Sequence, residues 1–129
     1  MSFDVYLQAG SGARRLPTTV VLRRRLQGHI AEDSGTSCRM TDGATLSYGQ
    51  GRPPGDDEAL TSLSINRPGA DWLWGATFEL LRDYDYFLFW PGGEFALVCD
   101  PHVKVPDVCP LPARVVASLQ DVLDQIRQS

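Results

Sequence analysis

Residues that form disulfides, bind metals or act as nucleophiles are scarce in this sequence of 129 residues, which has three cysteines and two histidines. An odd number of cysteines without paired spacing argues against a disulfide framework and fits the reduced thiols of a cytosolic protein. Cys99, His102 and Cys109 lie closest together, but a structural zinc site needs four ligands, usually in close pairs. No nucleophile motif surrounds any cysteine. We therefore expect no catalytic residue, no metal and no cofactor.

Long apolar runs are also lacking. The longest, residues 86–90, is far short of the roughly 20 residues that a membrane-spanning helix needs. The chain begins MSFD, without a basic start or the apolar region of a signal peptide. We therefore expect a cytoplasmic protein that does not enter a membrane.

An excess of basic residues is absent as well, since 16 acidic residues against 12 basic ones give a net charge of −4. This balance argues against a dedicated nucleic-acid binder. Five of the arginines fall within residues 1–30, but no aromatic residue is interleaved with them as a base-stacking surface requires. Residues 23–25, three arginines in a row, are typical of a solvated helix face. The oligomeric state is not indicated by the sequence.

The composition, 43% hydrophobic and 22% charged, is that of an ordinary globular protein, and the length suits one domain over residues 1–129. Alternating or continuous apolar residues predict strands at 3–7, 36–40, 44–48, 60–66, 86–90 and 95–99. Helical spacing predicts helices from Pro17 to about Gly28 and over residues 71–82, the second capped by Asp71.

The C-terminal part permits two interpretations. Ser118 and Asp121 resemble a capping box ahead of a helix over 119–127, which makes 113–117 a last strand. One continuous helix from Ala113 is the alternative; we favour the strand followed by the helix. The fold class expected is α+β, with a mainly antiparallel sheet of about five to seven strands and two or three helices packed on it. The helices at 71–82 and 119–127 are expected to pack on the strand pair 86–90 and 95–99.

A glycine loop at residues 10–15 lies between a strand and a helix, where phosphates are often cradled. It lacks the Lys-Ser/Thr ending of a P-loop and the third glycine of a dinucleotide fingerprint, so an ordinary loop is favoured.

Acidic residues and an exposed tryptophan form the predicted binding surface. Trp72 and Trp74 lie two apart on one helix and cannot both face the same core, so Trp72 is expected to be partly exposed. An exposed tryptophan near carboxylates is typical of a protein-binding hot spot. The predicted partner-binding residues are Asp56, Asp57, Glu58, Trp72, Asp83 and Asp85.

Several segments resemble small, largely uncharacterised bacterial proteins. The segments are SFDVYLQ at residues 2–8, LSINRP at 63–68, Asp71 with LW at 73–74, and PGG at 91–93. In size, acidity and α+β order the chain is also similar to cytosolic immunity proteins of bacterial toxin systems. These resemblances imply no catalytic residues.

Together these features predict a non-enzymatic, acidic protein-binding domain of the immunity kind, which neutralises a basic bacterial toxin domain by occluding it. The alternative is a small enzyme or ligand-binding protein with a pocket near Tyr86, Asp100 and His102.

Overall fold

The computed structural model of the chain describes residues 4–48, 52–66 and 71–128. Its helices are α1 (Thr19–Arg25), α2 (Asp71–Asp83) and α3 (Leu119–Gln128). Its strands are β1 (Asp4–Ala9), β2 (Ile30–Asp33), β3 (Ser37–Met40), β4 (Thr45–Ser47), β5 (Ser62–Asn66), β6 (Tyr86–Phe89), β7 (Ala96–Val98) and β8 (Ala113–Val115). No helix among these residues is long and apolar enough to cross a membrane.

The eight strands form one sheet in the order β2-β3-β4-β5-β1-β6-β7-β8. Neighbouring strands are antiparallel, except that β8 runs parallel to β7. The α+β domain with a mainly antiparallel sheet is therefore confirmed, while the predicted range of five to seven strands is one too low.

The additional strand is β2. Ile30 falls at helical spacing after Leu26, but α1 ends at Arg25, and Gly28, with a φ of 89°, turns the chain before Ile30. The residues that follow Ile30 in β2 are all exposed, so an edge strand forms without any alternation of apolar and polar residues. The Asp-Gly hairpin predicted next is confirmed: Gly43 has a φ of 94° between β3 and β4.

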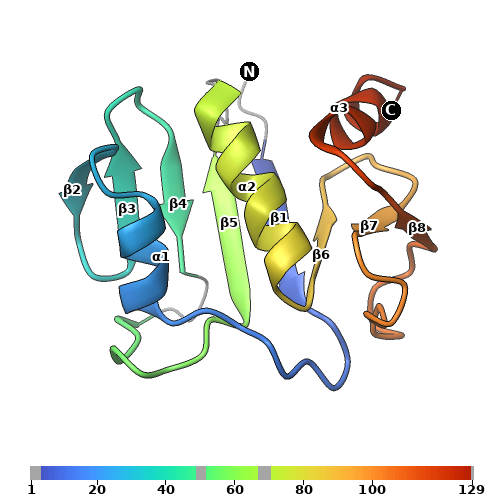
Figure 1. Ribbon diagram of the computed structural model, residues 1–129, viewed down its shortest axis with the longest axis horizontal. Coiled ribbons are helices and arrows are strands. Elements are labelled where there is room, and N and C mark those ends of the chain that lie inside the picture. Colours follow the sequence, from blue (N-terminus) through green and yellow to red (C-terminus); the bar gives the residue numbers. More distant parts are fainter. Residues whose placement is uncertain (1–3, 49–51, 67–70, 129) are drawn as a thin grey trace.

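The helices all cover one face of the sheet (Figure 1). Along β1, β5 and β6 alternate side chains point to that face, and six of them are fully buried: Val5, Leu7, Leu63, Ile65, Tyr86 and Leu88. The core on this face joins leucines and a valine from strands and helices alike: Leu7, Leu63, Leu88, Leu22, Leu80 and Val122. The expected packing of α2 on β6 is confirmed, and α3 joins the same core through Val122 and by contact with α2.

The opposite face carries no described helix, and we call it the helix-free face. The strand register places one row of half-buried side chains across it, from β3 to β6: Ser37, Ser47, Ser64, Tyr6 and Phe89. At the β6–β7 end a second, smaller apolar cluster forms where the proline-rich segment 100–112 folds back over Phe87 and Val98. The continuous apolar runs at 86–90 and 95–99 require both faces of their strands to be covered, and this segment covers the face opposite the helices.

The C-terminal part forms a strand followed by a helix, as favoured, and not one continuous helix. The Ser118 hydroxyl caps α3 by accepting the Asp121 N–H at 3.2 Å, and the Asp121 carboxylate accepts the Ala117 N–H, one residue before the cap, at 2.9 Å. The second helix begins at Asp71, as predicted. The side chain of Asp71 and residues 67–70 lie outside the described part of the chain, and so does the first residue of the strand predicted at 3–7.

Truncation of the helix-side core is expected to be costly. Leu63→Ala removes a fully buried side chain beneath the helices and is expected to lower the free energy of unfolding by about 2–5 kcal/mol. Ser64→Ala, one residue along on the helix-free face, is expected to change it by no more than about 0.5 kcal/mol. Urea unfolding of both variants checks the assignment of faces, which equal effects would contradict.

Candidate functional site

The six predicted partner-binding residues differ in how far their side chains are already paired within the chain. Asp56 and Asp57 are exposed in the loop before β5 and make no ion pair with any described residue. Glu58 is held by both terminal nitrogens of Arg52, at 2.9 and 3.0 Å. These hydrogen bonds hold the pKa of Glu58 below its ordinary value. Only the first two of these carboxylates therefore present an uncompensated charge.

Trp72 and Asp83 lie near opposite ends of α2, about 16 Å apart along its axis at 1.5 Å per residue. Trp72 is half-buried and stacks on His29, with ring centroids 3.9 Å apart. Asp83 accepts hydrogen bonds from Arg82 and from Arg25, each at 2.9 Å, which keep its pKa below the ordinary value. The expected partial exposure of Trp72 is correct, and its ring is already stacked on an imidazole of the same chain.

Asp85 holds the loop between β1 and α1. Its carboxylate accepts the backbone N–H groups of Arg14 at 3.0 Å and Arg15 at 2.9 Å. It also accepts two side-chain N–H groups of Arg15, at 3.0 and 2.9 Å. Burial alone would raise the pKa of Asp85, but these hydrogen bonds outweigh it and lower the pKa. The glycine loop therefore does bind an anion, and that anion is a carboxylate of the same chain.

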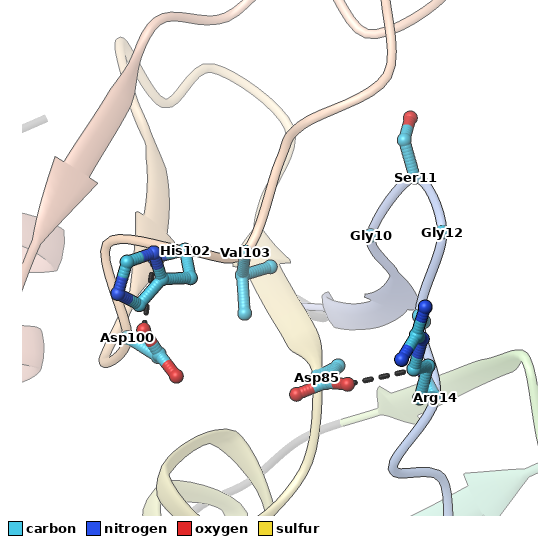
Figure 2. A pocket seen from close by; sticks show the side chains of 9 residues that line it. Gly10, Ser11, Gly12, Arg14, Asp85, Asp100, His102 and Val103 are labelled. Carbon is cyan, nitrogen blue, oxygen red and sulfur yellow. Dashed lines mark hydrogen bonds between the residues drawn. The ribbon is translucent and has the colours of Figure 1, made fainter.

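This glycine loop forms one side of a pocket of about 280 Å³, here called the loop pocket. Asp100, His102 and Val103 form the other side (Figure 2). Gly10 permits the close approach, because a Cβ there would lie 2.8 Å from the Val103 side chain and 2.9 Å from the Lys104 carbonyl. Two features far apart in the sequence, the glycine loop and the Asp100–His102 turn, thus meet at one place.

The loop pocket has few groups free to bind a phosphate. The backbone N–H groups of Gly10, Ser11 and Ala13 donate within the chain, as do those held by Asp85. The His102 N–H donates to the Asp100 carboxylate at 2.8 Å, which makes the turn on that side. The predicted third member, Tyr86, lies outside the pocket: its buried hydroxyl donates to the Leu60 carbonyl at 2.6 Å. The alternative pocket therefore contains two of its three predicted residues.

The cysteines are distributed over both faces of the sheet. Cys99 packs against the helix-side core and Cys109 against the cluster on the helix-free face. Burial raises the pKa of the Cys99 thiol to about 11, and it raises the pKa of Cys38 as well. A nucleophilic cysteine needs the opposite shift. Within the described residues no group of three or more histidine, cysteine, aspartate or glutamate side chains is placed to hold a metal ion.

Two of the three consecutive arginines on α1 are paired with acids of the same chain. Arg23 lies 2.7 Å from Asp33, and Arg25 lies 2.9 Å from Asp83. Beneath Arg23 the sequence analysis missed a buried contact, in which the Cys38 sulfur and the Tyr48 hydroxyl are 3.0 Å apart. The arginine cluster thus links α1 to β2 and α2 and is not an open basic surface.

A second pocket, of about 330 Å³, opens at the β6–β7 end of the helix-free face, and we call it the apolar pocket. Phe87 and Phe89 stack in it with ring centroids 5.7 Å apart, and Phe89 also stacks on Tyr6 at 5.2 Å. Pro106 and Leu111 from the proline-rich segment line it as well. The sequence analysis missed this pocket, although the apolar run at 86–90 and the four prolines after residue 100 were the signal.

Removal of the Asp85 charge is expected to loosen the loop. Asp85→Asn loses charge-assisted hydrogen bonds and is expected to lower the free energy of unfolding at pH 7 by about 1–3 kcal/mol. Because the folded pKa of Asp85 lies below the unfolded value of about 4, its contribution is full above that pH and is lost as the pH falls through the folded value. Urea unfolding between pH 7 and pH 2.5 is expected to show a smaller loss of stability in the variant than in the wild type. Asp56→Asn, in the exposed loop, is the control and is expected to retain the wild-type profile.

The geometry therefore offers two candidate sites, the polar loop pocket and the apolar pocket on the helix-free face. The first is occupied in part by the chain's own carboxylate, and the second contains no charged side chain in its lining. Comparison of the sequence and structure with protein-family models, curated proteins and solved structures finds no match.

Proposed function

We propose that this chain is a non-catalytic protein-binding domain of the immunity kind, which acts in a bacterial cytosol by occluding a basic toxin domain. The observation that carries the proposal is the one-sided covering of the sheet: every described helix lies on one face. The other face presents a row of half-buried small and aromatic side chains. A broad sheet face of this kind suits a protein surface better than a small molecule.

Charge supports a basic partner. The chain has a net charge of −4, and two of its three consecutive arginines are already paired with carboxylates. Asp56, Asp57, Glu94 and Asp107 are exposed and make no ion pair with any described residue. Unpaired surface carboxylates raise the rate at which a basic protein arrives and disfavour acidic competitors.

The titratable groups support a role without catalysis. His29 stacks on Trp72, and among the described residues neither histidine side chain is hydrogen-bonded to a thiol, hydroxyl or carboxylate. A nucleophile and its base normally lie within hydrogen-bond reach of one another.

A second candidate function is the binding of a small polar ligand in the loop pocket. One observation favours it, the convergence of Arg14, Asp100 and His102 on a hollow of about 280 Å³. The two functions can be distinguished by experiment. The double substitution Arg14→Ala with His102→Ala would abolish the binding of a ligand in this pocket and leave protein capture unchanged.

The tagged chain, used for affinity capture from its native host, is expected to retain a basic protein less well as the salt concentration rises. Ser64→Lys places a charge in the middle of the helix-free face and is expected to weaken this capture at least tenfold. Gln120→Lys makes the same substitution on an exposed position of α3 and is expected to retain the partner. Equal capture by both variants, or no basic protein at low salt, contradicts the proposal.

The proposed immunity role also predicts that the captured protein is toxic. Expression of the captured protein alone is expected to stop bacterial growth, and co-expression of this chain is expected to restore growth. Restoration by Gln120→Lys and not by Ser64→Lys assigns the protection to the helix-free face. A captured protein that leaves growth unaffected contradicts toxin neutralisation while leaving protein binding in place.

A further inference from the structure

The apolar pocket is shaped for a side chain that needs no hydrogen bonds. Phe87 and Phe89 present aromatic surface from β6, and Pro106, Pro110 and Leu111 line it from the proline-rich segment. Proline has no backbone N–H to offer. The polar side-chain groups among the residues that the structure places in the lining are the amide of Gln8, the indole N–H of Trp90 and the thiol of Cys109.

The size of the pocket is compatible with such an occupant. Its volume of about 330 Å³ is near the lower end of the roughly 300–1,000 Å³ that is usual for ligand pockets. That space suits one large side chain better than an extended cofactor. Val108, also in the lining, is 89% exposed and continues the apolar surface outward.

The surroundings of the pocket are acidic. Glu94 directly follows the lining residue Gly93, and Asp107 lies between the lining residues Pro106 and Val108. Both carboxylates are exposed, and neither is within ion-pair distance of a described arginine or lysine. An apolar hollow with uncompensated carboxylates beside it is complementary to an apolar side chain with cationic neighbours.

We propose that the apolar pocket is the anchor site for the basic partner: it receives one aromatic or leucine side chain, and Glu94 and Asp107 pair with lysine or arginine residues beside that side chain. This inference rests on the proposed protein-binding function and names the chemistry of the segment that is bound. It moves the anchor from Trp72, which is stacked on His29, to a hollow on the helix-free face.

The probe is the peptide acetyl-Arg-Phe-Arg-amide, titrated into the ¹⁵N-labelled full chain and followed by amide chemical shifts. Shifts are expected to concentrate at residues 87–93 and 106–111. Acetyl-Arg-Ser-Arg-amide and acetyl-Glu-Phe-Glu-amide, which lack the anchor or reverse the charges, are each expected to bind at least fivefold more weakly. Shifts elsewhere, no shifts at millimolar peptide, or equal binding of the three peptides would overturn the proposal.

Charge reversal supplies the matched control. Glu94→Lys with Asp107→Lys is expected to weaken peptide binding at least fivefold, whereas Glu32→Lys with Glu79→Lys makes the same change in net charge on β2 and α2 and is expected to have little effect. All four positions are exposed, so both variants are expected to retain the fold.

Affinity capture with the two charge-reversed variants distinguishes a failure of the anchor proposal from a failure of the proposed function on which it rests. If the partner is lost by the Glu32/Glu79 variant and kept by the Glu94/Asp107 variant, the anchor lies elsewhere while protein binding stands. If neither pair of substitutions affects the partner, the anchor proposal is also wrong. If the wild-type chain captures no basic protein, the proposed function fails before the anchor is considered.

Discussion

The structure depends on one physical constraint: the apolar side chains that alternate along the central strands have to be covered. The three helices within the described residues all cover them from the same side. Leu7, Leu63 and Leu88 are fully buried there beneath leucines and a valine of the helices. Covering one face of an antiparallel sheet is sufficient for a stable core, so the other face is free to carry a different chemistry. The proposed binding surface lies on the face that the helices leave uncovered, so the residues that stabilise the core are largely separate from those proposed to bind.

Much of the fold was predictable because local signals agreed with the tertiary packing. Three local signals each specify their element within a few residues, and each element is present. They are the Asp-Gly turn of the hairpin, the helical spacing of apolar residues in α2 and the cap at Ser118. The failure at Ile30 has a physical reason, since a short edge strand needs only backbone hydrogen bonds from one neighbour and leaves no pattern in its side chains.

The candidate sites were less predictable, because charge in a sequence does not reveal its partner. Asp83 and Asp85 belong to the acidic part of the chain, yet the structure pairs them with Arg25 and Arg15, which come from the basic part. The apolar pocket requires the segment after Cys99 to fold back over β6. The apolar run at 86–90 indicated that β6 has a cover on both faces, but not that this cover leaves a hollow. Composition therefore indicated an excess of carboxylates but not which of them are paired within the chain.

The proline-rich segment forms one wall of the apolar pocket, and within residues 100–112 it contributes no named strand or helix. Substitutions at its exposed positions, such as Asp107 and Val108, leave the sheet ladder and the helix-side core untouched. Point mutations at these positions can therefore change the shape and charge of the pocket wall at little cost in stability. For the proposed toxin-binding role, this would allow the wall to change along with the surface of the toxin.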